Sequence, residues 1–355
     1  MSRYFIGIMS GTSLDGVDLA YCDEDIKLIH AKTYPFDEAL KKRILKAING
    51  TTTLQEVGLL SVDLGSFFAS LVKQFMSEFG ITKLDAIGSH GQTLWHYPPH
   101  FSMQLGCAHT IASRIGVRVV ADFRQKDLTL GGEGAPLAPA FHSYAFASHK
   151  SSAVLNIGGM ANITILQDPS NNQLIGYDTG CGNVLLDLVA KEKFGVSFDE
   201  GGRLAKEGRC DEALLEKMLS EAYFAKSYPK STGREKFNKA WLELMLDGFS
   251  ISPRDLLATL AELTATSITK EAKKHSIVQL IVCGGGAKND HLLELLRSKL
   301  QGVRICTSDE LGVSSEFMES MAFAYLARER LDGKSVKISS VTGASRDTLL
   351  GVIYD

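Results

Sequence analysis

The chain opens with the stretch Tyr4-Phe5-Ile6-Gly7-Ile8-Met9-Ser10-Gly11-Thr12-Ser13-Leu14-Asp15-Gly16-Val17-Asp18, which decides its fold more than any other. Residues 4–9 form an apolar run typical of a buried strand, and the glycine-containing turn 10–16 leads into a second strand-like run over 17–22. The same order returns about 150 residues later, where Gly158-Gly159-Met160-Ala161-Asn162 lies between strand-like runs at 153–157 and 163–166. Each half of the chain therefore begins with a strand, a glycine turn and a strand, which suggests a duplicated unit.

Helices and strands alternate after each of these openings. From the spacing of apolar residues and the glycines that end them, helices are expected over residues 37–49, 54–79, 110–115, 183–194, 211–222, 236–246, 253–274 and 290–300. Further strands are expected over residues 85–88, 117–121, 174–177 and 278–283. The segment 122–139 is rich in glycine and proline and is expected to be a loop. This alternation is typical of an α/β fold.

Length and charge limit the number of domains and the kind of partner. The chain has 355 residues, whereas a single hydrophobic core usually stops growing at about 250 to 300. We therefore expect an N-terminal lobe over 1–130 and a C-terminal lobe over 131–355, whose last segment could pack back on the first lobe, with a cleft between the lobes. The formal charge is −3 and there is no run of Lys and Arg, so the positive patch that binds nucleic acid or an anionic membrane is lacking. Small molecules are the expected partners.

The cysteines and the apolar segments bear on cellular location. The six cysteines are scattered and contain no C-x-x-C pair, which suits a reducing compartment. Apolar runs are interrupted before the ~18 residues that a membrane span needs, and the first residues do not have the character of a signal peptide. A cytoplasmic location is therefore expected.

Three glycine-containing stretches, each directly after a strand-like run, are candidates for binding phosphate: residues 10–16, 157–162 and 284–289. Backbone N–H groups can approach an anion closely where glycine leaves room for it. One such stretch alone would favour a simple tight turn, but three in one chain favour phosphate binding. A Walker A motif is absent, since Arg328 stands where the first glycine before Gly333-Lys334-Ser335 is needed, and Gly284-Gly285-Gly286 lacks the Rossmann spacing.

Two acidic residues are candidates for chemistry. Asp178 follows a strand-like run and precedes a glycine turn and a helix, so it could be a general base or, equally, a turn or helix-capping residue. Glu319 belongs to an amphipathic segment over 316–326 whose apolar stripe favours core packing. Its carboxylate stays a candidate for substrate binding.

Polar and aromatic residues gather between His90 and His100, as they often do in sugar-binding pockets. A zinc site formed by His96 and His100 is the competing interpretation, but a pair of prolines separates them and no further ligand completes a known spacing. Arg124, in the expected loop, offers a planar guanidinium for a carboxylate or a phosphate.

Six motifs, in this order along the chain, resemble the anhydro-N-acetylmuramic acid kinase family of the sugar kinase, heat-shock ATPase and actin superfamily. They span essentially the whole chain and are Met9 to Asp18, His90-Gly91-Gln92-Thr93, Ala121-Asp122-Phe123-Arg124 through Gly131-Gly132-Glu133-Gly134-Ala135-Pro136-Leu137, Asn156 to Asn162, Asp178-Thr179-Gly180, and Gly284 to Asn289. The resemblance implies an α/β, two-lobed actin-like ATPase fold with duplicated mixed-sheet lobes and an inter-lobe cleft for ATP.

The resemblance also implies the roles of particular residues. ATP would be bound by three sets of residues: Gly11, Thr12, Ser13, Leu14, Asp15, Gly16, Val17 and Asp18; Gly158, Gly159 and Asn162; and, near the adenosine, Gly284, Gly285, Gly286 and Asn289. Asp178 matches the catalytic aspartate of the family. The sugar would be bound by Arg124, which suits its lactyl carboxylate, with Asp122, His90, Gln92 and Glu319 as weaker candidates.

The implied enzyme is a phosphotransferase that opens 1,6-anhydro-N-acetylmuramic acid and yields N-acetylmuramic acid 6-phosphate and ADP in peptidoglycan recycling. Asp178 would activate a water for attack on the anomeric carbon, and the departing bridge oxygen would take the γ-phosphoryl of ATP. Mg²⁺ is expected with ATP. Its protein ligands stay unknown, because Met9 and Asn156 stand where many superfamily members carry an aspartate, so phosphate oxygens and water are expected to hold it. Cys181 stands where the family commonly has proline, which leaves the carboxylate in place.

Two other functions stay open at this point. An actin-like kinase for another sugar or a small acid would share the ATP loops but would need no base for water. A non-catalytic, ATP-regulated actin-like protein would keep the loops without a sugar-specific carboxylate. A homodimer is compatible with the sequence, which does not determine the oligomeric state.

Overall fold

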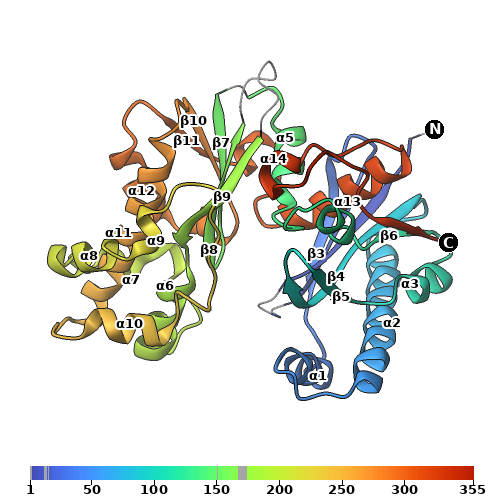
Figure 1. Cartoon of the computed structure of the whole chain (residues 1–355), viewed down its shortest axis with the longest axis horizontal. Helices are drawn as coiled ribbons and strands as arrows, with labels where there is room; N and C mark the ends of the chain where they lie inside the picture. Colours follow the sequence, from blue (N-terminus) through green and yellow to red (C-terminus); the bar gives the residue numbers. More distant parts are fainter. Residues whose placement is uncertain (1, 12–13, 15, 150, 167–173) are drawn as a thin grey trace. The chain divides into compact units, whose positions relative to one another are not determined.

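The computed structural model describes residues 2–11, 14, 16–149, 151–166 and 174–355 and divides the chain into two compact units. The first unit is made of Met1–Tyr144 and Phe317–Asp355, and the second unit is Ala145–Glu316. Each unit is built on its own mixed β-sheet (Figure 1). The second unit is therefore inserted into the sequence of the first.

The sheet of the first unit runs in the order β12-β6-β4-β1-β2-β3, and β5 pairs with β4. Neighbours β1, β4 and β6 are parallel, whereas the pairs β1–β2, β2–β3, β4–β5 and β6–β12 are antiparallel. The strands are β1 (Phe5–Ser10), β2 (Val17–Cys22), β3 (Leu28–Tyr34), β4 (Ala86–Tyr97), β5 (Phe101–Leu105), β6 (Arg118–Ala121) and β12 (Val352–Tyr354). The central strand β1 carries the apolar run of the opening sequence, and Phe5, Ile6 and Ile8 are fully buried.

The longest helix of the first unit, α2, begins at a capping box formed by Thr53 and Glu56. Its length and composition would allow it to span a membrane, but Leu64, Phe68 and Phe75, spaced on one face, are buried in the core of this unit. The helices of this unit are α1 (Glu38–Ile48), α2 (Leu54–Glu78), α3 (Ala108–Ile115), α4 (Gln125–Thr129), α5 (Ala138–Ala145), α13 (Met318–Leu331) and α14 (Ser339–Thr342).

Helix α13, near the C-terminus, packs directly on the strands formed by the N-terminus of the chain. A Cβ atom on Gly7 of β1 would collide with the carbonyl oxygen of Ser320, and one on Gly88 of β4 with that of Phe323. Glycine at these two positions lets the helix backbone approach the sheet closely. The C-terminal segment is thus part of the first unit, and in Figure 1 the red helix α13 lies with the blue strands.

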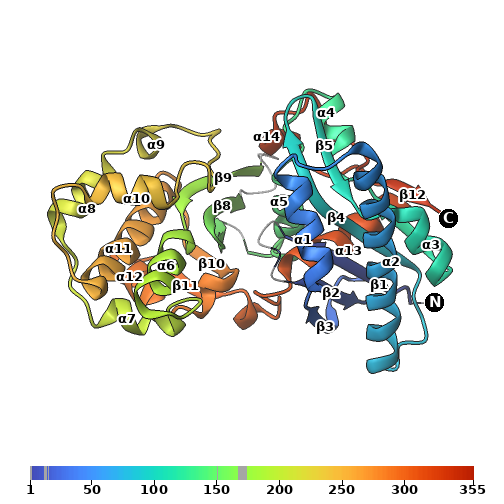
Figure 2. The same ribbon diagram turned by 90° about the horizontal axis from the view of Figure 1, so that it is seen from below.

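The sheet of the second unit runs in the order β11-β10-β7-β8-β9. Its strands are β7 (Ser152–Ile157), β8 (Met160–Leu166), β9 (Leu174–Cys181), β10 (Gln279–Cys283) and β11 (Arg304–Thr307). Its helices are α6 (Val184–Val189), α7 (Arg203–Lys206), α8 (Glu212–Leu219), α9 (Ala222–Ala225), α10 (Lys239–Leu246), α11 (Pro253–Ala272) and α12 (Asp290–Lys299). Helices α11 and α12 lie side by side (Figure 2).

The two sheets share one topology. The order β6-β4-β1-β2-β3 of the first unit corresponds to β11-β10-β7-β8-β9 of the second, with an antiparallel meander of three strands followed by two parallel strands in each. The hairpins β1–β2 and β7–β8 are equivalent in this comparison. The duplicated mixed-sheet fold predicted from the sequence is therefore confirmed.

Several elements differ from the sequence-based predictions. The strand expected over 85–88 continues as β4 to Tyr97, so it includes the motif His90-Gly91-Gln92-Thr93, because β5 provides an antiparallel partner for its second half. Helices α4 and α5 lie in or extend from the expected loop 122–139. The helix expected over 183–194 is divided into α6 and a π-helical turn at Ala190–Phe194.

The sequence predicted two lobes over 1–130 and 131–355. In the structure the first boundary between the compact units lies after Tyr144. Residues 131–144 belong to the first unit, because the backbone N–H of Gly134 donates to Asp127 (2.7 Å) and that of Glu133 donates to the carbonyl oxygen of Thr342 (2.9 Å). The hydroxyl of Thr342 donates to the other oxygen of Asp127 (2.7 Å). These bonds connect the loop after α4 to α14.

Candidate active site

The second and third glycine turns meet at one edge of the sheet in the second unit. Gly284 has a φ of 77°, and a Cβ at this position would collide with the side-chain oxygen of Asn156. The carbonyl oxygens of Gly158 and Gly159 accept hydrogen bonds from the backbone N–H groups of Asn183 (2.8 Å) and Val184 (3.1 Å). The turn after β7, the turn after β10 and the start of α6 are therefore held together.

Three polar residues lie in register across neighbouring strands at this edge. Asn156 of β7 pairs with Asn162 of β8, and Asn162 pairs with Asp178 of β9. All three are half-buried. The sequence predicted that Asp178 directly follows a strand over 174–177, whereas it lies inside β9, which continues to Cys181 because β8 pairs with it over that length. Two amide groups and a carboxyl group thus form a row beside the glycine turns.

The carboxyl group of Asp178 is bound by a segment about 50 residues further along the chain. Its Oδ2 accepts a hydrogen bond from the backbone N–H of Thr232 (2.9 Å), and no other residue that the structure describes donates to this carboxyl group. Burial raises the pKa of Asp178 to about 6; the N–H of Thr232 and the charge of Lys230 lower it, and the charge of Glu235 raises it further. A carboxyl group with such a pKa is suited to taking a proton near neutral pH.

Sequence reasoning missed the segment 230–234. The hydroxyl of Thr232 is buried and has no hydrogen-bond partner among the described residues. The guanidinium of Arg234 lies beside the second glycine turn, since a Cβ on Gly159 would be 3.8 Å from its Nη2. The run Ser231-Thr232-Gly233-Arg234 of small polar and basic residues is a weak signal that could have drawn attention to it.

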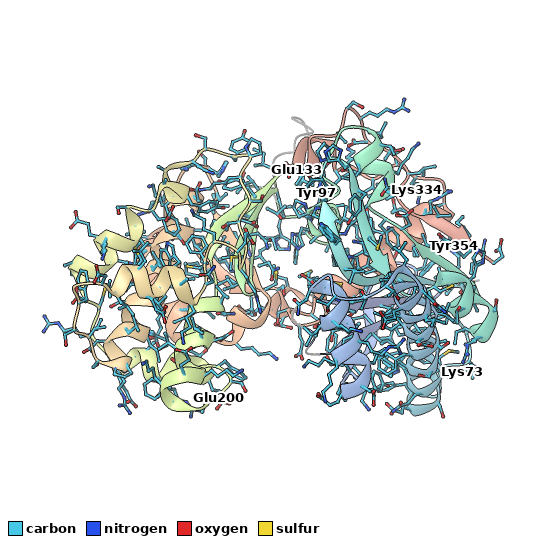
Figure 3. All side chains as sticks on the ribbon, turned by 60° about the horizontal axis from the view of Figure 1, so that its bottom comes forward. Lys73, Tyr97, Glu133, Glu200, Lys334 and Tyr354 are labelled. Atoms are coloured by element: carbon cyan, nitrogen blue, oxygen red, sulfur yellow. The ribbon has the colours of Figure 1, made fainter. Side chains whose placement is uncertain are left out.

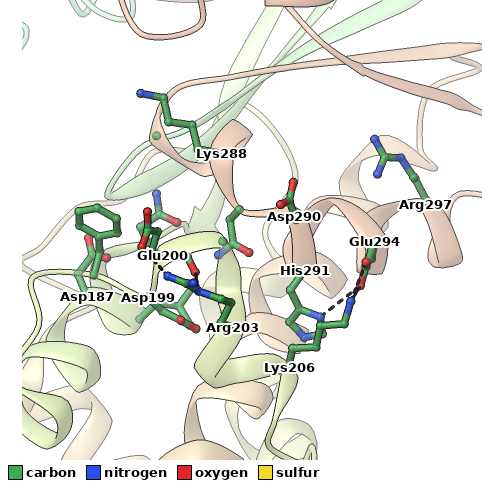
Figure 4. Close-up of a pocket in the computed structure, with 16 residues that line it drawn as sticks. Asp187, Asp199, Glu200, Arg203, Lys206, Lys288, Asp290, His291, Glu294 and Arg297 are labelled. Atoms are coloured by element: carbon green, nitrogen blue, oxygen red, sulfur yellow. Dashed lines mark hydrogen bonds and ion pairs between the residues drawn. The ribbon is translucent and has the colours of Figure 1, made fainter.

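A pocket of about 960 Å³ opens in the second unit beside the third glycine turn (Figure 4). Its size lies in the range of small-molecule sites. Lys206 points to Glu294, with 2.7 Å between Nζ and Oε2, and His291 lies on the same side of Glu294. The lining residues are Asn183, Leu186, Asp187, Phe198, Asp199, Glu200, Gly201, Arg203, Lys206, Gly285, Lys288, Asn289, Asp290, His291, Glu294 and Arg297.

Two predicted ATP-binding residues, Gly285 and Asn289, line this pocket. Asn289 caps helix α12 by accepting a hydrogen bond from the backbone N–H of Leu292 (3.0 Å). Gly285 leaves open space around its Cα, because a Cβ there would be 3.8 Å from its nearest neighbour, Asn183, whereas Gly286 is buried against Ile157. The wall formed by residues 198–206 was not predicted, because it comes from a stretch without a recognised motif.

Arg124 is the centre of a polar group in the first unit. Its Nε donates to Nε2 of His90 (3.2 Å), its Nη2 lies 2.9 Å from the same atom, and its Nη1 donates to the carbonyl oxygen of Gly134 (2.7 Å). Burial lowers the pKa of Arg124 to about 10. The negative charges of Glu319 and Asp127 raise it, but they offset only part of the effect of burial. Burial, with the charge of Arg124, also lowers the pKa of His90 well below its usual value, so His90 is neutral.

Other predicted residues of the first unit lie near this group or near the first glycine turn. Gln92 accepts a hydrogen bond from the hydroxyl of Ser10 and donates one to the carbonyl oxygen of Gly11 (3.4 Å). Exposed Glu319, in the first turn of α13, interacts through its charge with Asp18 and Arg124. The carboxylate of Asp18 accepts a hydrogen bond from the hydroxyl of Thr33 (2.6 Å).

The first glycine turn is described in part. Leu14 is buried, has a φ of 57° and donates its N–H to the carbonyl oxygen of Gly11 (3.3 Å). Gly16 packs closely on β3, and Val17 begins β2. Thr12, Ser13 and Asp15 lie outside the described residues.

Asp122, the remaining predicted sugar-binding residue, has a φ of 55°. Burial raises the pKa of its carboxyl group, which the backbone N–H of Gln125 lowers. The carboxylate is therefore used, at least in part, to hold its own loop.

The described residues contain no group of three or more His, Cys, Asp or Glu side chains that could hold a metal ion. His96 and His100, considered for zinc, are engaged otherwise: Nδ1 of His96 lies 2.9 Å from the hydroxyl of Ser102, and the ring of His100 stacks on Tyr97, which Figure 3 labels.

Comparison with known proteins identifies the family. The family model of anhydro-N-acetylmuramic acid kinase matches residues 3–355. The chain is 50% identical over 372 aligned residues to a protein from Sulfurimonas denitrificans that bears this name, with 100% of each chain covered. It is 44% identical to a protein of the same name from Vibrio cholerae serotype O1, with 99% of this chain and 98% of the relative covered.

Among solved structures, component A of (R)-2-hydroxyglutaryl-CoA dehydratase from Acidaminococcus fermentans has a TM-score of 0.51 to this chain. The match covers 93% of this chain and 99% of that one at 12% identity, so it indicates likeness of fold alone. The actin-like fold expected from the sequence is confirmed, and this match carries no activity over to the chain. Since the family model and the relatives match it from end to end, the chain belongs to the anhydro-N-acetylmuramic acid kinase family and is an ATP-using phosphotransferase of cell-wall recycling.

Proposed function

We propose that this chain opens 1,6-anhydro-N-acetylmuramic acid with Asp178 as the general base and phosphorylates the released oxygen 6 with ATP. The observation that carries the assignment is the state of Asp178. Its carboxyl group, with a pKa raised by burial to about 6, lies in register with Asn162 and Asn156 beside two glycine turns. A base at that position is ionised at neutral pH and still basic enough to accept a proton.

The proposed reaction balances without a separate general acid. Asp178 takes a proton from water, and the water oxygen forms a bond to the anomeric carbon as the bond from that carbon to the bridge oxygen breaks. The transition state is then of the oxocarbenium type known from inverting glycosidases. The bridge oxygen keeps the bonding electron pair and attacks the γ-phosphorus of ATP, and ADP leaves. We assign the water to Oδ1 of Asp178 and to the buried hydroxyl of Thr232, which otherwise has no partner among the described residues.

For ATP, we assign the adenosine to the pocket lined by Gly285 and Asn289 and the phosphates to the glycine turns. The guanidinium of Arg234, close to Gly159, supplies positive charge at the second turn. Mg²⁺ would be held mainly by phosphate oxygens and water. The side-chain amide oxygens of Asn156 and Asn162, which pair across β7 and β8, are the oxygen ligands that the protein would offer. When bound, the ion neutralises negative charge on the phosphates.

For the sugar, we assign the lactyl carboxylate to Arg124. Three of its five N–H groups are used by His90 and Gly134, so one N–H remains on each terminal nitrogen. Two N–H groups on neighbouring nitrogens match the two oxygens of a carboxylate. Gln92, Glu319 and Asp122 remain weaker candidates, and the predicted cleft between lobes remains a prediction.

The mechanism is tested with water labelled with oxygen-18. Incubation with ATP, Mg²⁺ and the anhydro sugar should give a product heavier by one labelled oxygen, located at the anomeric carbon and absent from the phosphate. Unlabelled product kept in the same water for the same time corrects for exchange through the open-chain sugar. An unlabelled product would contradict hydrolytic opening.

The Asp178→Asn variant tests the base. It should lose turnover while it keeps ATP affinity within about twofold, because the substitution removes the proton acceptor but preserves the shape of the side chain. Calorimetric titration with ATP is the control. Turnover near that of the natural chain would contradict the assignment.

A further inference from the structure

A buried ion pair lies behind the proposed catalytic aspartate in the second unit. The ammonium of Lys230 is 2.7 Å from Oε1 of Glu271, and the two side chains are 1% and 2% exposed. Lys274 binds the other carboxylate oxygen at 2.7 Å. A buried ion pair is weak evidence for stability, since apolar residues of the same volume often replace one without loss. Its presence therefore calls for another explanation.

The backbone around Lys230 is bound to Asp178 at two points. The N–H of Asp178 donates to the carbonyl oxygen of Lys230 (3.1 Å), and the N–H of Thr232 donates to the carboxylate of Asp178 (2.9 Å). The segment 230–232 therefore fixes both the backbone and the carboxylate of Asp178. Any displacement of this segment moves the hydrogen bond that orients the carboxylate.

Tyr223 connects the ion pair to the same residue from another direction. Its hydroxyl donates to the carbonyl oxygen of Asp178 (2.8 Å), and the ammonium of Lys230 lies 5.0 Å from the centre of its ring. Tyr223 itself is buried. Lys230 thus contacts a residue that holds Asp178, while its own backbone holds Asp178 directly.

Glu271 supplies the fixed point of this arrangement. It lies at the C-terminal end of α11, a 20-residue helix most of which is buried. The segment 226–232, in contrast, is largely exposed and contains no helix or strand. The bond from Lys230 to Glu271 connects this irregular segment to a rigid element, which is how precise geometry is obtained from a loop.

We propose that Lys230 and Glu271 are positioning residues for Asp178: their ion pair anchors the segment 230–232 on α11, so that the N–H of Thr232 holds the carboxylate in the orientation needed to activate water. The inference rests on the proposed role of Asp178 as base. It assigns no contact with substrate to either member of the pair.

Several charged or titratable groups face this site, and they determine what each substitution does to the proton affinity of Asp178. They are Lys230, Glu235 and Tyr223 around Asp178, and Lys274, Tyr177 and His275 around Glu271. The charge of Lys230 favours the ionised carboxylate, as does the N–H of Thr232. Loss of the charge of Lys230 and of the bond from Thr232 should therefore raise the pKa of Asp178.

The test is the double substitution Lys230→Met with Glu271→Met, which removes both charges and keeps apolar volume. The variant is expected to fold with a thermal midpoint close to that of the natural chain, whereas its kcat should fall about 10- to 100-fold, as a misplaced catalytic group does. The KM for ATP should stay within about twofold. The acid limb of the pH–rate profile should move to higher pH.

Glu271→Ala and Glu271→Gln keep the test decisive if the double variant does not fold. Glu271→Ala removes the acceptor of Lys230, so kcat should fall about 10- to 100-fold. Glu271→Gln keeps an oxygen that can accept from Lys230, so kcat should stay within about threefold. The matched control is Lys239→Met with Glu192→Met, an exposed pair of the same 2.7 Å length in the same unit, which should change neither kcat nor the profile.

Two results would overturn the proposal: a folded double variant with a natural kcat and profile, or a folded Glu271→Ala variant whose kcat equals that of Glu271→Gln. Failure of the base assignment is recognised separately, because Asp178→Asn would then remain active. If Asp178→Asn is inactive and the double variant is normal, the positioning role alone is refuted.

Discussion

The general base of this reaction must be ionised when substrate binds and must also be basic enough to accept a proton from water. In Asp178 these demands are met by opposing effects: burial and the charge of Glu235 favour the protonated carboxyl group, whereas the N–H of Thr232 and the charge of Lys230 favour the carboxylate. The resulting pKa of about 6 lies close to neutral pH, as general-base catalysis requires.

The pH dependence of kcat/KM for the anhydro sugar follows from this value. Since the ionised form of Asp178 is the active one, activity should rise about tenfold per pH unit below pH 6 and level off above it. Steady-state rates between pH 5 and pH 8 measure the limb, with thermal melting at pH 5 to verify folding. The variant Asp178→Glu shows whether the loss of activity at acid pH comes from residue 178 or from protonation of ATP. If it comes from ATP, the pH at which activity falls should be the same in the variant and in the natural chain. A profile flat down to pH 5 contradicts the assignment.

Arg124 should act on one substrate and not on the other. Replacing Arg124 by Ala should raise the KM for the anhydro sugar about 10- to 100-fold, the loss expected for a charge-assisted pair, and leave the KM for ATP unchanged. Arg124→Lys should be intermediate, because it keeps the charge without the planar arrangement of donors.

The specificity of this effect can be examined with 1,6-anhydro-N-acetylglucosamine, which lacks the lactyl group. Its inhibition constant should be the same for the natural chain and for Arg124→Ala. Equal weakening of both sugars would mean that Arg124 supports the shape of the site through His90 and Gly134 and does not bind the carboxylate.

At the scale of elements, close backbone approach depends on a few glycines. Gly7 and Gly88 allow α13 to pack closely on the sheet of the first unit. In the middle of α2, a Cβ added to Gly65 would lie only 2.6 Å from the carbonyl oxygen of Cys107. Gly58, in the same helix, has open space around it. Residue type alone does not distinguish the two, because the difference lies in what packs against each.

Helix α2 therefore offers a matched pair of substitutions. Gly65→Ala should destabilise the chain by about 1 to 3 kcal/mol through overpacking, and Gly58→Ala should stabilise it by about 0.5 to 1 kcal/mol, because alanine is the better helix former. Urea unfolding of both variants measures the two changes in the free energy of unfolding. Equal changes in the same direction would show that Gly65 is not closely packed.

The sequence predicted those features whose signals are local. The apolar runs and glycine turns of β1–β2 and β7–β8 are continuous in the chain, and Asp178 stands out beside one of them. Thr232, Lys230 and Arg234 carry at most a weak local signal, because their approach to Asp178 and Gly159 is created by packing across about 50 to 75 residues. Strand β5 and the second half of β4 depend on each other for pairing, which periodicity in either segment alone does not show.

At the scale of the whole molecule, the two units share a topology but differ in continuity. The second unit is one uninterrupted stretch, Ala145–Glu316, whereas the first needs both ends of the chain. Helix α13 covers β1 and β4, and β12 pairs with β6 at the edge of that sheet. The first unit is therefore incomplete without residues 317–355.

Fragments should reflect this difference. Residues 145–316 expressed alone should unfold in one cooperative transition, because their core is complete. Residues 1–144 alone should stay unfolded or aggregate, and the same residues joined by a flexible linker to 317–355 should fold. Circular dichroism during heating measures each transition. Cooperative unfolding of 1–144 without the C-terminal segment would contradict the part assigned to α13 and β12.

The return of α13 to the first strands has a consequence for biosynthesis. As the polypeptide leaves the ribosome, β1, β2 and β4 emerge first, yet the helix that covers them is translated after Glu316. The inserted unit can be finished while the earlier segment still exposes its apolar sheet face. Nascent chains stalled near residue 316 should therefore recruit chaperones through their N-terminal strands, and release of the last 39 residues should end that exposure.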